Sequence, residues 1–143
     1  MILYLDTSAV VKKYFKEPGS DDVIELWKKS EAVTSSAVTY AEALAAFYRK
    51  CREVPTKRTV LQRAAQRFEK DWQSMIIVEL TRQLGAAVRR LIQKHPLRGF
   101  DAIHLASALL VQENLKRKYR FVCYDHALLL AAANEGLVVF PDR

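Results

Sequence analysis

Four short apolar runs and one weaker strand candidate, separated by longer segments with helical spacing, limit the fold of this chain more than any other feature. The runs are residues 2–5, 75–78, 121–124 and 137–140, and the weaker candidate is residues 32–35. Their length suits buried strands, and strands that alternate with helices form a parallel sheet with helices on both faces. The sequence therefore predicts a three-layer α/β fold with a central parallel β-sheet flanked by helices.

The segments between the runs have helical periodicity. We expect helices over residues 7–15, 20–29, 39–52, 56–72, 81–95, 102–116 and 126–134. Pro18-Gly19 breaks the first pair, Thr81 is expected to cap the fifth helix, and the short link at Pro55 predicts an antiparallel helical hairpin. The helix that Asp101 opens is apolar on most sides, which indicates burial between layers.

Length and charge bound the class of protein. With 143 residues, the chain is expected to form one domain over residues 1–143. The formal net charge of +7 and a pI of about 9.5 favour a polyanionic partner such as nucleic acid. On charge alone, a solvated basic surface explains these values equally well.

Cysteine spacing and hydropathy indicate a reducing compartment and no membrane segment. Cys51 and Cys123 lie far apart without C-x-x-C spacing, so neither a zinc site nor a disulfide framework is expected. The N-terminus lacks the regions of a signal peptide, and charges interrupt every apolar stretch well short of a membrane span. We therefore expect a cytoplasmic protein.

Four carboxylates, which we call the acidic quartet, lie where expected strands end or helices begin. They are Asp6, Glu42, Asp101 and Asp125. Parallel α/β sheets bind ligands in the crevice outside the carboxyl ends of their strands. Carboxylates gathered there repel one another unless a cation lies between them, so the pattern predicts a hard divalent ion held by oxygen ligands.

Helix capping is the simpler explanation for each acid taken alone. Asp6, Asp101 and Asp125 each stand where an N-cap or a helix-dipole partner is favoured. Thr39-Tyr40-Ala41-Glu42 matches the S/T-x-x-E capping box. His104, one turn beyond Asp101, is expected to be a satisfied core or edge histidine that could hydrogen-bond Asp101.

Four segments together resemble the PIN-domain family, and most closely the VapC-type toxins of toxin–antitoxin pairs. They are Leu5-Asp6-Thr7-Ser8-Ala9, Thr39-Tyr40-Ala41-Glu42, Asp101-Ala102-Ile103-His104-Leu105-Ala106-Ser107-Ala108 and Tyr124-Asp125. The resemblance implies a metal-dependent ribonuclease with a parallel sheet. It also implies that the acidic quartet is both the catalytic set and the set of metal ligands.

Further expectations follow from that resemblance. The ion would be Mg²⁺ or Mn²⁺, Asp101 or Asp125 would orient the attacking water, and cleavage would leave a 5′-phosphate and a 3′-hydroxyl. Cys123 stands where the family often has Ser or Thr, and a thiol is a weaker hydrogen-bond donor. Ser8 and Ser36 are expected to support the site by analogy.

The expected partners are an RNA substrate, a cognate antitoxin that covers the acidic site, and a second copy of the chain in a homodimer. Candidate phosphate contacts fall into three basic clusters, residues 12–16, 49–58 and 116–120. The sequence assigns no base-reading residue, because Trp27, Trp72 and the tyrosines are expected in the core.

Other readings of the same chain differ in what they require. A dehalogenase-like phosphatase needs D-x-D-x-T, but Ser8 stands at the second Asp, and a receiver domain needs an Asp after its third strand and a Lys near its last. The main alternative is a non-catalytic PIN-like module that binds RNA or protein. A stand-alone RNA-processing nuclease is the other.

Overall fold

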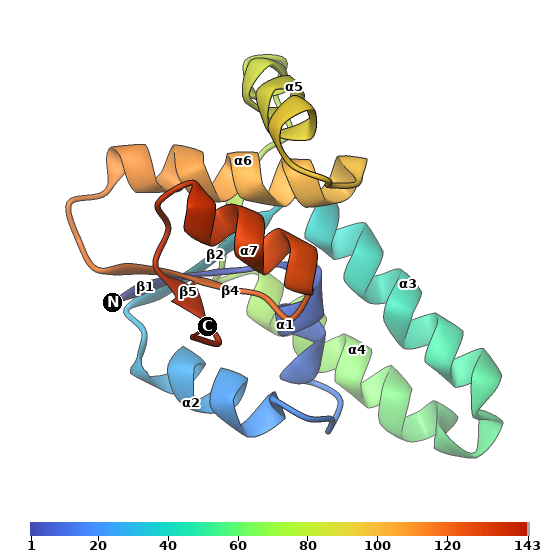
Figure 1. Ribbon diagram of the computed structural model, residues 1–143. Coiled ribbons are helices and arrows are strands. Elements are labelled where there is room, and N and C mark those ends of the chain that lie inside the picture. The colour runs from blue at the N-terminus through green and yellow to red at the C-terminus, as the bar shows by residue number, and fades with distance from the viewer. Residues whose placement is uncertain (143) are drawn as a thin grey trace.

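A five-stranded parallel sheet organises residues 1–142, the part of the chain that this computed structural model describes (Figure 1). Its strands are β1 (Ile2–Leu5), β2 (Ala32–Ser36), β3 (Ile76–Val78), β4 (Tyr119–Val122) and β5 (Val139–Phe140). Their order is β3-β2-β1-β4-β5, so β1 lies at the centre. Every neighbouring pair is parallel, which confirms the predicted sheet.

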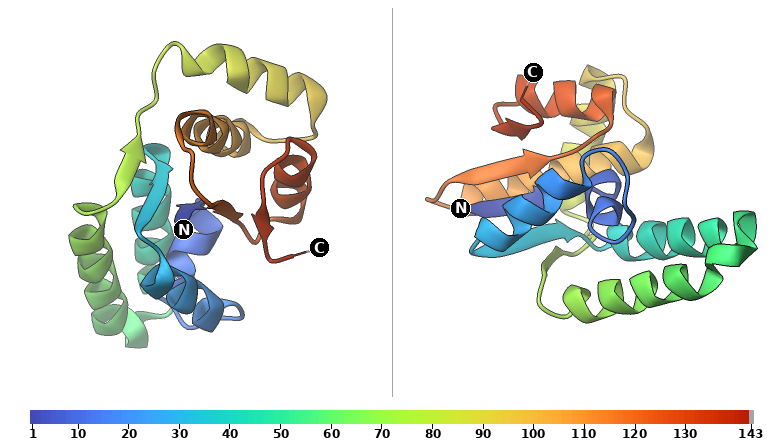
Figure 2. Two further views of the ribbon diagram at one scale, coloured as in Figure 1. Left: turned by 90° about the vertical axis from the view of Figure 1, so that its left-hand side faces the viewer. Right: turned by 90° about the horizontal axis from the view of Figure 1, so that it is seen from below.

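Helices cover both faces of the sheet, as predicted. They are α1 (Thr7–Lys12), α2 (Ser20–Lys29), α3 (Val38–Glu53), α4 (Arg58–Trp72), α5 (Leu84–Lys94), α6 (Gly99–Asn114) and α7 (His126–Asn134), with a 3-10 turn at Pro55–Lys57. Figure 2 shows α5, α6 and α7 on one side of the sheet and α2, α3 and α4 on the other. No helix in residues 1–142 is long and apolar enough to cross a membrane.

The central strand supplies side chains to two separate cores. Leu3 and Leu5 pack with α1 to α4, whereas Ile2 and Tyr4 pack with α5, α6 and α7. Successive strand residues point to opposite faces, so a strand buried on both faces must be apolar throughout. This explains why residues 2–5 form a continuous apolar run with no alternation.

The predicted hairpin of α3 and α4 is held by an aromatic cluster. The Phe47 and Phe68 ring centroids lie 5.6 Å apart, and Trp72 lies 5.6 Å from Phe68. Trp72 and Trp27 pack against this core as partly buried side chains, as expected. Tyr48 is exposed on α3, so the expectation that every tyrosine lies in the core is wrong at that position.

The first helix is shorter than predicted because its last two aromatic residues leave it to enter the core. α1 ends at Lys12, and Tyr14 and Phe15 are buried beyond it. The Ser20 hydroxyl donates to the Phe15 carbonyl at 2.8 Å, which turns the chain toward α2. The helical periodicity of residues 7–15 therefore predicted the buried residues correctly but overestimated the length of the helix.

Other boundaries also differ from the prediction, among them the starts of α5, α6, β4 and β5. Thr81 does not cap α5, which begins at Leu84; the Thr81 carbonyl accepts a backbone hydrogen bond from Leu84 at 3.2 Å. β4 begins two residues earlier than expected because Tyr119 pairs with Ile2 of β1. That register leaves Cys123 beyond the strand and free to face the end of β1.

A charged clasp fastens α5 to the end of α7. The Glu135 side chain is almost fully buried and accepts from Arg90 at 2.9 Å, Lys94 at 2.9 Å and His95 at 2.6 Å. Burial alone would raise the pKa of Glu135, but the three donors outweigh it and lower the pKa to about 2. The clasp fixes the segment that leads into α6.

Replacing Glu135 with Gln should remove about 1–2 kcal/mol of stability at neutral pH, after allowance for the exposure of Arg90 and Lys94. A lowered folded-state pKa stabilises the fold above the unfolded value, about 4.3, and this contribution is lost as the pH falls toward 2. Urea unfolding at pH 7 and pH 2 measures the difference, with Glu113→Gln as an exposed control. An equally large difference in the free energy of unfolding between wild type and Glu135→Gln at pH 2 would contradict this linkage.

Phe68→Ala should lower the free energy of unfolding by about 3–5 kcal/mol, because it empties the centre of the aromatic cluster. Val60→Ala on the exposed side of α4 should change it by no more than about 0.5 kcal/mol. Urea midpoints measured on both variants compare them directly. Equal losses would show that the cluster does not hold the hairpin to the sheet.

Candidate active site

The first turns of α1, α3, α6 and α7 meet at the edge where the strands end, which we call the carboxyl edge (Figure 1). β1 delivers Asp6 to the first turn of α1, and β4 leads through Cys123 to Asp125. α3 and α6 carry Glu42 and Asp101 in or near their first turns. The four helix starts thus place the acidic quartet at one edge of the sheet.

Asp6 is the most buried member of the quartet, with 4% of its surface exposed. One carboxylate oxygen accepts from the Ala9 amide at 3.0 Å and the Ser8 hydroxyl at 2.7 Å. The other accepts from the Cys123 thiol at 3.3 Å. Burial raises the pKa of Asp6, against the opposing effects of the nearby His104 and of these hydrogen bonds.

Glu42 is held by side chains from two other helices. The Thr7 hydroxyl donates to Glu42 Oε1 at 2.6 Å, and His104 Nε2 lies 3.0 Å from the same oxygen. His104 Nδ1 lies 2.9 Å from the Tyr4 hydroxyl, so a Tyr4 donor fixes the tautomer in which Nε2–H faces Glu42. Burial alone would raise the pKa of Glu42, but the bonds from His104 and Thr7 lower it.

The capping-box explanation for Glu42 is wrong. α3 begins at Val38, so Thr39 lies inside the helix, where it is buried and its hydroxyl lies 2.7 Å from that of Ser35. The Glu42 side chain is therefore directed to Thr7 and His104 and not to its own helix terminus. These contacts agree with the other explanation, in which Glu42 lies at the carboxyl edge with the rest of the quartet.

Asp101 and Asp125 each accept a backbone hydrogen bond at the start of a helix, and their charges repel each other. Asp101 Oδ2 accepts from the Arg98 amide at 3.2 Å, and Asp125 Oδ1 accepts from the Leu128 amide at 3.0 Å. Burial and then repulsion from Asp125 raise the pKa of Asp101. Capping and proximity to other acids thus occur together, because each carboxylate uses one oxygen for its helix.

Cys123 joins two members of the quartet. Its thiol donates to Asp6, and its sulfur accepts from the Asp125 amide at 3.3 Å. Burial, and next the charge of Asp6, raise the pKa of the Cys123 thiol, so the donor proton stays in place. The thiol therefore makes contacts of the kind that a Ser or Thr hydroxyl would make here.

The supporting residues are partly those expected. Ser8 contacts Asp6 and also accepts from the Tyr124 amide at 3.0 Å, which ties α1 to the loop after β4. Ser36 accepts from the Val38 amide at 3.2 Å and makes no hydrogen bond to the quartet within residues 1–142. Thr7 and Tyr4 were not singled out from the sequence. The position of Thr7, next to Asp6, is the signal that could have identified it.

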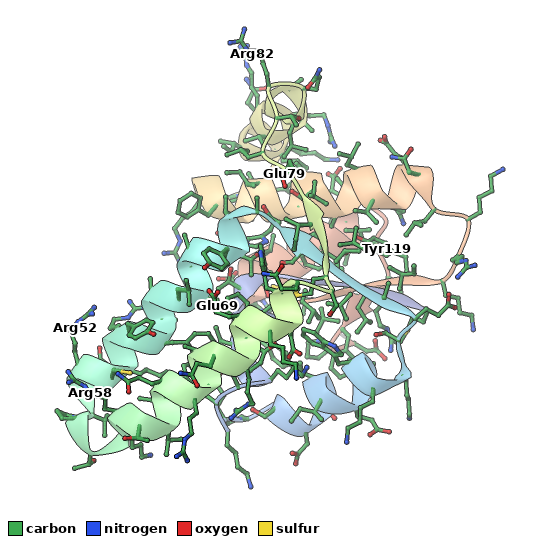
Figure 3. The ribbon with its side chains drawn as sticks, turned by 180° about the vertical axis from the view of Figure 1, so that it is seen from behind. Arg52, Arg58, Glu69, Glu79, Arg82 and Tyr119 are labelled. Carbon is green, nitrogen blue, oxygen red and sulfur yellow. The ribbon has the colours of Figure 1, made fainter. Side chains whose placement is uncertain are left out.

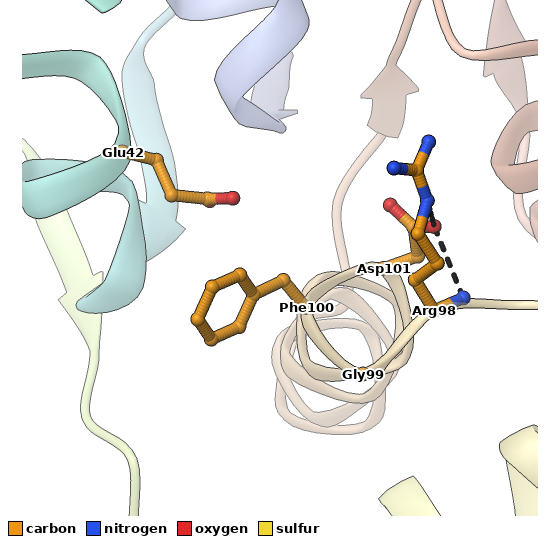
Figure 4. Close-up of a pocket in the computed structure, with 5 residues that line it drawn as sticks. All are labelled: Glu42, Arg98, Gly99, Phe100 and Asp101. Carbon is orange, nitrogen blue, oxygen red and sulfur yellow. Dashed lines mark hydrogen bonds and ion pairs between the residues drawn. The ribbon is translucent and has the colours of Figure 1, made fainter. Parts of the chain in front are cut away.

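An open cavity of about 420 Å³ adjoins these acids, and we call it the site cavity. Its lining is Glu42, Arg98, Gly99, Phe100 and Asp101 (Figure 4). In the figure the Glu42 carboxylate points from α3 toward the first turn of α6. Two members of the quartet therefore face a space large enough for part of a ligand.

The chemistry of the quartet suits a hard divalent ion, since it offers only carboxylate oxygens. The raised pKa values of Asp6 and Asp101 reflect charge that is held out of water, and a cation would relieve this. In residues 1–142, however, no three His, Cys, Asp or Glu side chains are arranged as a ready-made metal cluster. The donor set fits the ion, whereas a shared coordination shell is a prediction.

Comparison with known proteins adds a family to this geometry. Residues 3–132 match the family model described as PIN domain. The chain is 37% identical over 110 residues to Ribonuclease VapC45 of Mycobacterium tuberculosis, which covers 77% of this chain and 76% of that protein. The residues that match the family model, 3–132, include all four members of the quartet.

Solved structures share the fold. The Mycobacterium tuberculosis toxin VapC20, described as cleaving the sarcin-ricin loop, superposes with a TM-score of 0.69 at 15% identity and covers 95% of this chain and 96% of its own. VapBC2 from Rickettsia felis, bound to a DNA fragment from its promoter, gives 0.65 at 14% identity over 97% of each chain. At such identities the likeness concerns the fold alone.

Removing the Cys123 thiol should loosen the quartet. Cys123→Ala is expected to cost about 1–3 kcal/mol of stability, because Asp6 and the Asp125 amide both lose a partner in a buried place. Cys123→Ser should retain most of this stability, since the Ser hydroxyl can replace the contacts of the thiol with Asp6 and with the Asp125 amide. Cys51→Ala, at a buried thiol outside the site, is the matched control in urea unfolding. Equal losses for Cys123→Ser and Cys123→Ala would contradict this role.

Proposed function

The chain belongs to the PIN-domain family, and from this membership we propose that it is a metal-dependent endoribonuclease, the toxin of a type II toxin–antitoxin pair. Asp6, Glu42, Asp101 and Asp125 would hold Mg²⁺ or Mn²⁺ and form the catalytic set. The proposal treats residues 1–143 as one catalytic domain that works in the cytoplasm. The observation that carries it is the meeting of four carboxylates from four helix starts at the carboxyl edge.

When bound at such a site, a divalent ion activates water and offsets charge on the scissile phosphate. The side chains of this protein have separate tasks. Thr7 and His104 fix one oxygen of Glu42, so this carboxylate is oriented before substrate arrives. Orientation of this kind lowers the reorganisation needed during reaction.

Asp101 is the better placed of the two acids proposed to orient the attacking water. It lines the site cavity, whereas Asp125 does not. Within residues 1–142 only one of the Asp101 oxygens is bound by another residue, Arg98.

The basic surface that supports RNA binding is the tip of the α3–α4 hairpin. In the other two candidate clusters some cations form ion pairs, as Lys12 does with Glu17 and Arg117 with Glu31, whereas Lys16, Lys116 and Lys118 form none within residues 1–142. In the hairpin cluster no cation forms a salt bridge within residues 1–142, and its five members are Arg49, Lys50, Arg52, Lys57 and Arg58. Figure 3 shows Arg52 and Arg58 near the end of the hairpin.

α3 links this basic tip to the acidic site. The helix begins at the carboxyl edge with Glu42 near its start and ends at Glu53 beside the cationic turn. An RNA strand bound along α3 would thus meet phosphate-binding groups at one end and the quartet at the other. This arrangement favours a catalytic nucleic-acid site over a module that only binds protein.

The remaining partners are proposed from membership of the family. A small antitoxin would cover the acidic site, and two copies of the chain would form a homodimer. A stand-alone processing nuclease differs from a toxin in having no such antitoxin. A short reading frame directly upstream whose product copurifies with this protein would support the toxin, and its absence would favour the processing enzyme.

Metal-dependent cleavage of RNA by purified protein tests the proposed activity. Wild type with Mg²⁺ or Mn²⁺ should cut structured RNAs, while Asp6→Asn and Asp101→Asn should lower the rate by about 100-fold or more, because a bound ion supplies several kcal/mol of transition-state stabilisation. Glu113→Gln, a carboxylate at the far end of α6, is the matched control and should cut like wild type. Equal cleavage by all four proteins would identify a contaminating nuclease and reject the proposal.

A further inference from the structure

Phe100 is a large apolar side chain that the fold leaves in solvent beside the quartet. It is 57% exposed, although six residues that lie further along the same helix are buried. In Figure 4 its ring extends from the first turn of α6 toward Glu42, across the site cavity from Asp101. The sequence alone assigns no base-reading residue, so this exposed ring is a finding of the structure.

The position of Phe100 on α6 explains its exposure. Ala102 and Leu105 of the same helix are fully buried against the sheet and its covering helices. Phe100 lies in the first turn, at the carboxyl edge, where the other described residues leave more than half of its surface uncovered. The ring is therefore available to a ligand in the site cavity without any change in the core.

The charges around the ring select the kind of ligand that fits. Glu42 and Asp101 flank Phe100 and disfavour a phosphate directly at the ring. Arg98, 89% exposed at its side chain, stands at the rim of the same cavity with Nε 4.0 Å from Asp101 Oδ2. A ligand with a neutral flat group at the ring avoids repulsion by the two carboxylates, and an anionic group of the same ligand beside Arg98 would be attracted by the guanidinium.

We propose that Phe100 is a stacking platform for one unpaired RNA base next to the cleaved bond, and that Arg98 contacts a neighbouring phosphate. Proteins that bind single-stranded nucleic acid place bases on aromatic rings beside cationic groups. The substrate class is then RNA with an unstacked base, as in a loop, and not a perfect duplex. The inference rests on the proposed ribonuclease function and adds a substrate feature to it.

An apolar partner protein is the competing occupant, and the lining of the cavity disfavours it. Phe100 is the one large apolar side chain among the five lining residues, and the others are charged or glycine. A protein partner buries a patch of several apolar groups, whereas a single base needs one ring. The isolated ring between charges therefore fits a base better.

Binding of a labelled hairpin RNA with an unpaired loop, in EDTA so that no cleavage occurs, tests the platform. Phe100→Ala should weaken binding by about 5- to 150-fold, the range measured for stacking of one base. Phe100→Trp should bind like wild type. Val138→Ala, at a 59% exposed side chain beside Met1 and Lys118 on the opposite edge, is the matched control and should bind like wild type.

A scan of abasic positions through the loop separates stacking from a structural effect. One abasic position should weaken RNA binding by the wild-type protein by about the same factor as the Phe100→Ala substitution does. The same abasic position should not weaken RNA binding by Phe100→Ala further, since both changes remove the same contact. Binding of the matching perfect duplex should not depend on Phe100. Loop binding that is unchanged in Phe100→Ala, or abasic effects that are equal in both proteins, would overturn the proposal.

Arg98 has its own readout. Arg98→Gln should reduce the slope of log K against log salt by about 0.7, the value for one contact to a single-strand phosphate. An unchanged slope would overturn its assignment. If wild type cleaves RNA with metal but Phe100→Ala binds normally, the platform fails and the nuclease stands. If no metal-dependent cleavage occurs but Phe100 governs loop binding, the platform stands on a non-catalytic module.

Discussion

Parallel pairing of β1 with β2 on one side and β4 on the other is the constraint from which the rest of the structure follows. Because all three strands end at the same edge, the segments after them must turn there into helices. Asp6, Glu42 and Asp125 reach the carboxyl edge in this way, and α6 brings Asp101 to it from the layer above. Asp6 and Asp125, more than 100 positions apart in the chain, thus lie at one edge of the sheet because of strand direction.

The carboxylates serve the fold and the proposed chemistry together. Asp6 and Asp125 cap α1 and α7, and Asp101 binds the backbone at the start of α6. These amide donors, together with His104 near Asp6 and Glu42, oppose part of the cost of burying the carboxylates. The pKa values of Asp6 and Asp101 nevertheless stay raised, which marks where a cation would be most favourable.

The sequence predicted what depends on strand and helix periodicity, namely the α/β class, the parallel sheet and the position of each acid at an element boundary. It could not predict side-chain choices made between distant elements. Glu42 turned to Thr7 and His104 although its local pattern was that of a capping box, and Phe100 stayed exposed because the sheet ends beside it. Such choices depend on tertiary neighbours that lie far away in the chain, and local patterns do not encode them.

We propose that the acidic quartet holds a divalent cation, and Mn²⁺ binding followed by electron paramagnetic resonance measures this property. Wild type should bind Mn²⁺ saturably and melt at a higher temperature as the ion stabilises the native state. Replacing any one of Asp6, Glu42, Asp101 or Asp125 by its amide should weaken binding, and Glu113→Gln should not. Absence of saturable binding, or binding that the four amide variants leave unchanged, would contradict the account.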